Sequence, residues 1–261
     1  MVASEGGLFR RLKPLVLRNR TLFLPLIALA KFLRNKRVER RLKASYPNVE
    51  IITYDRNEVL KSGGVSELGQ DIYVLERLAP EGFKGVFLDI GCNHATLGNN
   101  SFALEKAGWS GFAFEPQSRF FESWVSERKT PIIQAAISNQ VAEVDFVEFE
   151  IVHGWEHLLS GFLDHADPAQ LSARPHKVIK VQTGPVAHFI EDTAQVDLAL
   201  IDVEGAEMQV LDGMGDVQPK WIIIENNREP VGNEALRQRL ITQGYSFVAR
   251  IGHTDDVFVR A

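Results

Sequence analysis

The sequence predicts an α/β fold with a doubly wound, mostly parallel sheet whose last strand is antiparallel. An apolar run at residues 86–90 passes through a small glycine turn into a helical pattern at 101–108, which is the first half of a βαβ unit. Two further buried strands, at 111–115 and 196–201, also lead into helical patterns. The chain closes with two strands joined by the short sequence Gly252-His253-Thr254-Asp255, and this predicts an antiparallel hairpin.

Length and cysteine content limit the class of protein. A chain of 261 residues suits one α/β domain of about 200 residues plus an appendage. The single cysteine rules out an intramolecular disulfide and fits a reducing, cytoplasmic compartment. This residue, Cys92, lies inside the glycine turn, where we expect a packing residue, because no partner base can be assigned to it.

Charge divides the chain into a basic arm, residues 1–45, and a domain, residues 46–261. The first 43 residues carry twelve Lys or Arg and two acids, whereas the remainder has a net charge of −15. Residues 22–30 are apolar and flanked by basic residues. They are too few to cross a bilayer, which needs about twenty, and the basic cluster beyond them disfavours a signal peptide. We expect an in-plane helix on the inner face of an anionic membrane. The alternative is a helix that docks on the domain or on a second subunit of a homo-oligomer.

The other elements are predicted from apolar periodicity. Residues 150–176 are irregular, and they form either an acceptor-binding insertion or a plain surface excursion. Their histidines lack the spacing of zinc ligands. We expect further strands at 49–54, 131–138, 144–149, 177–181 and 221–224, and helices at 207–213 and 234–243. A helix capped by Ser66 should have Leu68, Ile72, Leu75 and Leu78 on its apolar face. A helix that begins after Pro116 should bury Phe120, Phe121, Trp124 and Val125.

The glycine turn distinguishes between two classes of cofactor. A dinucleotide site requires G-x-G-x-x-G, but here Gly91 is followed by Asn93 and Ala95. Glu115 ends the second strand, at the place where a doubly wound fold binds ribose hydroxyls. An acidic pocket without a phosphate cradle suits a cationic nucleoside such as S-adenosylmethionine. The alternative is an ordinary α/β turn with incidental acids.

Carboxylates recur where predicted strands end. Asp89 and Glu115 lie at two such ends, Asp202 and Glu204 follow a third, and Glu225 ends a fourth. Ligands of open parallel sheets bind outside the carboxyl ends of the strands, where a buried acid is costly without a partner. This repetition predicts a functional site at that edge.

These motifs resemble the FkbM family of S-adenosylmethionine-dependent methyltransferases. The family's pattern is an "LDIGAN" turn, "FEP", an "AALS"-like strand end, "IDVEGxE" and "IIxE". The corresponding stretches here are 88–93, 114–116, 135–138, 201–207 and 223–225, in order and within about residues 66–226. Cys92 replaces the usual alanine, and His94-Ala95 replaces a small or glycine-containing continuation.

The resemblance implies a Rossmann-like class I methyltransferase with a seven-stranded sheet. It implies O-methylation of a sugar, glycolipid or polyketide-like acceptor, with S-adenosylmethionine as cofactor. Asp202 is the first candidate for the base, followed by Glu204 and His94. Each of these could instead bind the acceptor or position a divalent ion with Glu225, and no metal site is assigned. The expected cofactor-binding residues are Asp89, Gly91, Cys92, Asn93, Glu115, Pro116, Ala136, Ile137 and Asp202.

Other classes fit less well. A membrane-associated adapter with a degenerate methyltransferase fold is the main alternative, but it would not need both Asp89 and Glu115. A nucleotide-sugar dehydrogenase is disfavoured by the missing phosphate loop. Nucleic-acid binding is not expected, because the sequence lacks an aromatic or helical recognition module.

Overall fold

The computed structural model describes residues 36, 38–154, 156–191, 195–227 and 232–260. The chain divides between Asn48 and Val49 into two units, each described here by itself. The described part of the first unit is helical over residues 38–45, and Lys36 pairs there with Glu39 at 3.0 Å. The apolar stretch 22–30 lies outside the described residues, so its role stays a prediction. Among the described residues, we find no helix with the length and apolar character needed to span a bilayer.

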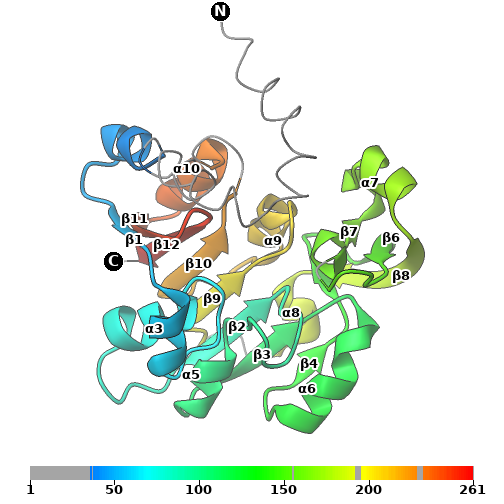
Figure 1. Ribbon diagram of the computed structural model, residues 1–261, viewed down its shortest axis with the longest axis horizontal. Coiled ribbons are helices and arrows are strands. Elements are labelled where there is room, and N and C mark those ends of the chain that lie inside the picture. The colour runs from blue at the N-terminus through cyan, green and yellow to red at the C-terminus, as the bar shows by residue number, and fades with distance from the viewer. Residues whose placement is uncertain (1–35, 37, 155, 192–194, 228–231, 261) are drawn as a thin grey trace, which may run out of the picture. The chain divides into compact units, whose positions relative to one another are not determined.

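The second unit is built around a mixed sheet of eight strands (Figure 1). All neighbouring pairs are parallel except those of β12, which runs antiparallel to both β10 and β11. The expected number of seven strands is corrected to eight, because the short β1 adds to the free edge of β11. The order across the sheet is β1 (Glu50–Ile52), β11 (Tyr245–Ile251), β12 (Asp255–Arg260), β10 (Trp221–Glu225), β9 (Leu198–Ile201), β2 (Val86–Ile90), β3 (Ser110–Phe114) and β4 (Ile132–Ile133).

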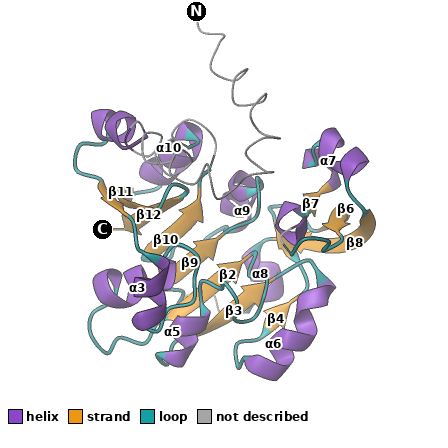
Figure 2. Cartoon of the chain, viewed as in Figure 1, coloured by secondary structure: helices purple, strands orange, loops and turns teal. Residues whose placement is uncertain are grey.

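Alternating strand residues bury both faces of this sheet. Leu88 and Ile90 of β2 belong to one core cluster, whereas Phe87 belongs to the other. This two-sided burial explains the continuous apolar runs in the central strands. Helices cover both faces (Figure 2): α8 (Val186–Phe189), α9 (Glu207–Gly213) and α10 (Glu234–Thr242) supply the first cluster, and α4 (Gln70–Tyr73) and α5 (Phe102–Lys106) supply the second.

A second sheet of four strands has the order β5-β8-β6-β7. The single strand expected over 131–138 is wrong, because it is divided: β4 joins the main sheet, whereas β5 pairs with β8. The described part of the irregular segment 150–176, which leaves out residue 155, contains one short strand and three short helical segments. The strands of the second sheet are β5 (Ala136–Ile137), β6 (Ala142–Phe149), β7 (Gly161–Phe162) and β8 (His176–Gly184). The helical segments between β6 and β8 are two 3-10 turns (Glu156–Leu159 and Leu163–His165) and α7 (Pro168–Ala173).

Two helix predictions need correction. Ser66 does not cap α4, whose N-cap is Gly69; its buried hydroxyl instead donates to Asp71. Helix α6 (Phe121–Glu127) starts after a 3-10 turn (Ser118–Phe120). Trp124 is buried in this helix, but Val125 is 77% exposed, because the next helical position turns away from the core. The remaining helical elements are α3 (Arg56–Lys61) and the π-helical turn Val74–Leu78.

Candidate functional site

The carboxyl ends of four adjacent strands meet at one edge of the main sheet. Ile90 of β2 lies opposite Phe114 of β3 and Ile201 of β9, and Ile201 lies opposite Ile224 of β10. The residues that follow these positions include the predicted acids Glu115, Asp202 and Glu225. The register therefore brings together side chains that are up to 110 residues apart in the sequence.

Gly91 fixes the distance between the glycine turn, residues 91–101, and Asp202. Its φ is +82°, and a Cβ atom there would lie 1.9 Å from the carbonyl oxygen of Asp202. The Gly91 amide donates to the carbonyl of Phe114 at 2.9 Å. A glycine is therefore required here by the protein's own backbone.

Glu115 is held by backbone amides on both sides of its carboxylate. Oε2 accepts from the Asn93 amide and Oε1 from the Gln117 amide, each at 2.9 Å. Burial raises the pKa of Glu115 to about 7, although these hydrogen bonds act to lower it. Asn93 itself has a φ of +52°, and its carbonyl accepts from Trp124 Nε1 at 2.7 Å.

Two further acceptor atoms lie beside Glu115. Asn93 Oδ1 and Gln117 Oε1 are buried and accept no hydrogen bond from any residue that the structure describes. The Gln117 amide cannot simply be reversed, because its Nε2 donates to the His157 carbonyl at 3.3 Å. Such atoms need a hydrogen-bond donor from water or a ligand. No local sequence pattern indicates Gln117 as a site residue.

Asp89 and Cys92 face into the protein. Asp89 accepts from Ser101 Oγ at 2.5 Å and from Asn99 Nδ2 at 3.4 Å. Burial raises the pKa of Asp89, while the Ser101 bond and the charge of Arg128 act to lower it. Burial also raises the pKa of the Cys92 thiol well above its ordinary value, which supports a packing role for Cys92. Both residues therefore shape the turn from behind.

His94 closes the glycine turn on itself. Its Nδ1 accepts from the amides of Thr96 and Leu97 at 3.1 and 3.2 Å, and its ring packs edge-on against Phe120. A neutral ring that accepts at Nδ1 carries its proton on Nε2. The role of His94 as the third candidate base stays a prediction.

The remaining predicted cofactor residues line the neighbouring loop and β5. The Pro116 carbonyl accepts from Gln134 Nε2 at 3.2 Å. Ala136 is half-buried and pairs with Thr183, whereas Ile137 is 1% exposed and belongs to the core.

Asp202, Glu204 and Glu225 form a cluster in which one carboxylate oxygen of each lies within 4.8 Å of the others. Glu204 is the most exposed of the three, and its φ is +53°, which is unusual for a residue with a side chain. Glu225 Oε1 accepts from Asn227 at 2.9 Å, whereas Oε2 is buried without a hydrogen-bond partner among the described residues.

Burial and mutual repulsion raise the pKa values of all three carboxyl groups. Burial and then the charge of Asp202 raise the pKa of Glu204 to about 8. Burial and then the charge of Glu204 raise the pKa of Glu225 to about 8, and burial and Glu225 raise that of Asp202 well above its usual range. A carboxylate tuned toward neutral pH can serve as a general base. The same oxygens are also of the type that binds a divalent cation.

Comparison with known proteins gives one family match. The family model described as "Methyltransferase FkbM domain" matches residues 89–247. The crystal structure of methyltransferase FkbM from Methylobacillus flagellatus KT superposes with a TM-score of 0.47 at 12% sequence identity. The alignment covers 75% of this chain and 48% of that chain, so this chain spans about half the length of that protein. No curated protein sequence matches.

Proposed function

Because the protein belongs to the FkbM methyltransferase family, we propose that it transfers a methyl group from S-adenosylmethionine to a hydroxyl group of a sugar, glycolipid or polyketide-like acceptor. The family match spans more than half of the chain and contains every residue proposed here for donor and acceptor chemistry. The observation that supports the proposal most is the close approach of Gly91 to the backbone carbonyl of Asp202, because the glycine turn is proposed to bind the donor and Asp202 is proposed as the base.

The residues around Glu115 fit the ribose of this donor. Ribose hydroxyls donate hydrogen bonds, and the edge offers acceptors: the Glu115 carboxylate and the buried oxygens of Asn93 and Gln117. A carboxylate oxygen has two lone pairs, so the bonds from the backbone amides leave acceptor capacity on Glu115. The proposed donor site consists of Gly91, Asn93, Glu115, Pro116 and Ala136. Asp89 and Cys92 shape the turn, the core residue Ile137 supports Ala136 from within the domain, and Asp202 borders the site as the candidate base.

The trio supplies the acid–base chemistry. S-adenosylmethionine provides a methyl group that is activated by its positively charged sulfur. The protein holds the acceptor hydroxyl in line with that methyl group, and Asp202 takes the hydroxyl proton as the new oxygen–carbon bond forms. Burial and then the charge of Glu225 increase the basicity of Asp202, because both raise its pKa.

The segment 150–176 is positioned to bind the acceptor. The Gln117 side chain donates to the carbonyl of His157 at 3.3 Å, and the rings of Phe120 and His157 pack edge-on with centroids 5.6 Å apart. These contacts attach the segment to the loop that follows Glu115. An acceptor bound between them would lie beside the proposed donor.

The basic arm supports a peripheral location on an anionic membrane. Its net charge is opposite to that of the remainder of the chain, so attraction to such a surface would act through the arm alone. We propose that the enzyme works in the cytoplasm, on the inner face of the membrane. The mutually repelling trio favours an enzyme over an adapter, because an adapter performs no acid–base chemistry that would require clustered carboxyl groups.

Binding and transfer of a labelled methyl group test the proposal. The purified protein is titrated with S-adenosylhomocysteine by calorimetry and then incubated with labelled S-adenosylmethionine and a cell extract. We expect saturable binding and one labelled acceptor class that is methylated on oxygen. A folded protein that binds neither compound contradicts the donor assignment, and a label on nitrogen or carbon contradicts the acceptor chemistry.

A further inference from the structure

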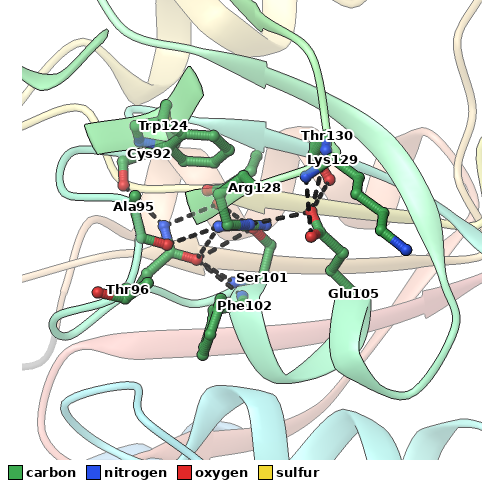
Figure 3. A network of polar contacts seen from close by, with 12 residues as sticks. Cys92, Ala95, Thr96, Ser101, Phe102, Glu105, Trp124, Arg128, Lys129 and Thr130 are labelled. Carbon is green, nitrogen blue, oxygen red and sulfur yellow. Dashed lines mark hydrogen bonds and ion pairs between the residues drawn. The ribbon is translucent and has the colours of Figure 1, made fainter. Parts of the chain in front are cut away.

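The glycine turn is held from behind by one buried guanidinium group, that of Arg128 at the C-cap of α6. Its side chain is fully buried. Nη1 donates to the Ala95 carbonyl at 2.8 Å and to Asn99 Oδ1 at 3.1 Å, and Nη2 donates to Ser101 Oγ at 3.0 Å. Figure 3 shows these bonds converging on Arg128. One side chain thus contacts the middle and the end of the turn.

The partners of Arg128 in turn form hydrogen bonds with residues at the start of the turn, from Asp89 to Asn93. Asn99 Nδ2 donates to the Cys92 carbonyl at 2.9 Å, and Ser101 Oγ donates to Asp89 at 2.5 Å. Trp124, whose ring lies 4.2 Å below the guanidinium, donates to the Asn93 carbonyl at 2.7 Å. The carbonyls of three turn residues, 92, 93 and 95, are therefore bound by this assembly.

The carbonyl bonds determine where the front of the turn points. A planar peptide directs its N–H opposite to its C=O. With the Cys92 carbonyl bound to Asn99, the Asn93 amide of the same peptide points toward Glu115, to which it donates at 2.9 Å. The orientation of the Glu115 carboxylate thus depends on bonds made on the far side of the turn.

Arg128 is itself fixed by a second partner. Its Nε donates to Glu105 Oε2 at 3.0 Å, and Glu105 also accepts from the amides of Lys129 and Thr130. Burial acts against the charge of Glu105, but the bonds from Thr130, Lys129 and Arg128 lower its pKa to about 2. The guanidinium is thus held between a permanent anion and the turn.

We propose that Arg128 is the positioning residue of the donor site: it holds the glycine turn in the shape that presents Asn93 and Glu115 to the ribose. This inference rests on the proposed function. It concerns a residue that contacts neither donor nor acceptor and whose effect passes through Ala95, Asn99 and Ser101.

Arg128→Lys and Arg128→Met test the proposal, with Arg237→Lys as the matched control. Arg237 is as buried as Arg128, pairs with Asp256 at 2.8 Å and lies over the ring of Phe247, but none of these contacts involves the turn. All three variants should lower the melting temperature. Only the Arg128 variants should weaken S-adenosylhomocysteine binding, by about tenfold or more, while Arg237→Lys stays within about twofold of wild type.

Hydrogen exchange provides a readout that is independent of the donor. The amides of Thr96, Leu97, Ser101 and Phe102 are bonded inside the turn, so they should exchange faster in Arg128→Lys and remain unchanged in Arg237→Lys. If Arg128→Met fails to fold, Trp124→Phe replaces it, because it removes only the bond to the Asn93 carbonyl and keeps a ring under the guanidinium.

The outcomes separate this inference from the proposed function. Folded Arg128 variants that retain donor affinity overturn the inference, as does equal loss of affinity in Arg237→Lys. If wild type binds no S-adenosylhomocysteine, the donor proposal fails. The hydrogen-exchange measurement then still tests whether Arg128 holds the glycine turn. Unchanged exchange of the turn amides in Arg128→Lys shows that it does not.

Discussion

Glu225→Gln should make the protein less sensitive to alkaline pH. The change removes one charge from the trio and keeps the size of the side chain, and the amide can donate to Asp202 or Glu204 where Glu225 Oε2 now lacks a partner. Because the pKa of Glu225 is raised in the folded state, the protonated Glu225 carboxyl group contributes to the free energy of unfolding, and this contribution is fully present below the pKa of Glu225 in the unfolded chain. It is lost as the pH rises through the folded pKa.

The size of the effect follows from the shift. The pKa of Glu225 rises from 4.5 to about 8, and each unit corresponds to about 1.4 kcal/mol, which gives an upper limit of about 5 kcal/mol. Glu225 is half-buried, so water screens part of the repulsion. Its neighbours can also stay protonated when Glu225 ionises. We therefore expect about 2 kcal/mol between about pH 5 and pH 9.

Urea unfolding at the two pH values measures this difference. The wild-type free energy of unfolding should fall from about pH 5 to pH 9 by about 2 kcal/mol more than that of Glu225→Gln, whereas the exposed Glu81→Gln should behave as wild type. Equal pH dependence in wild type and Glu225→Gln would refute the reasoning. Repeating the series with Mg²⁺ tests for a bound cation, which would abolish the pH dependence in wild type only.

Four further outcomes are expected. Glu115→Ala should weaken donor binding by about 10- to 150-fold in calorimetry; an unchanged affinity in a folded variant would contradict its assignment to the ribose. Asp202→Asn should keep donor affinity and lose about two to four decades of turnover, and near-normal turnover would show that no base is needed there. Gly91→Ala should cost about 2–4 kcal/mol in urea unfolding, and a wild-type midpoint would disprove the contact with Asp202. The full chain should bind anionic vesicles in a salt-sensitive manner, whereas a chain beginning at Ala44 should bind the donor but not the vesicles. If neither chain binds vesicles at low salt, the membrane proposal is wrong.

Much of the fold could be predicted because its signals are local. Buried parallel strands such as β2 and β9 are short apolar runs that end at a turn, and each can be recognised without knowing its partners. The division of 131–138 between two sheets could not be predicted this way. Gln134 and Ala135 look like strand residues, and only the pairing of Ala136 with Thr183 reveals the break. The exposure of Val125 likewise depends on which side of α6 faces the core, and its apolar character alone does not reveal this.

The candidate site was predictable to the extent that it lies at strand ends. Glu115, Asp202 and Glu225 each follow an apolar strand, so their common edge follows from a parallel sheet. Side-chain direction was not predictable: Asp89 turns inward because Ser101 and Asn99 offer donors there. Arg128 has no local signal at all, because its contacts to the turn span 27 to 33 residues.

The contact between Gly91 and Asp202 links donor charge to proton release. S-adenosylmethionine carries a sulfonium charge that S-adenosylhomocysteine lacks. If the donor binds against the turn as proposed, that charge would lie near three carboxyl groups whose pKa values are raised by burial and mutual repulsion. A nearby cation favours their ionised forms, and linkage is reciprocal, so donor affinity rises with pH while product affinity changes less. In the proposed reaction, loss of the sulfonium charge on methyl transfer would weaken the attraction to the trio, so the carboxyl groups proposed to accept the proton would also promote release of the demethylated donor.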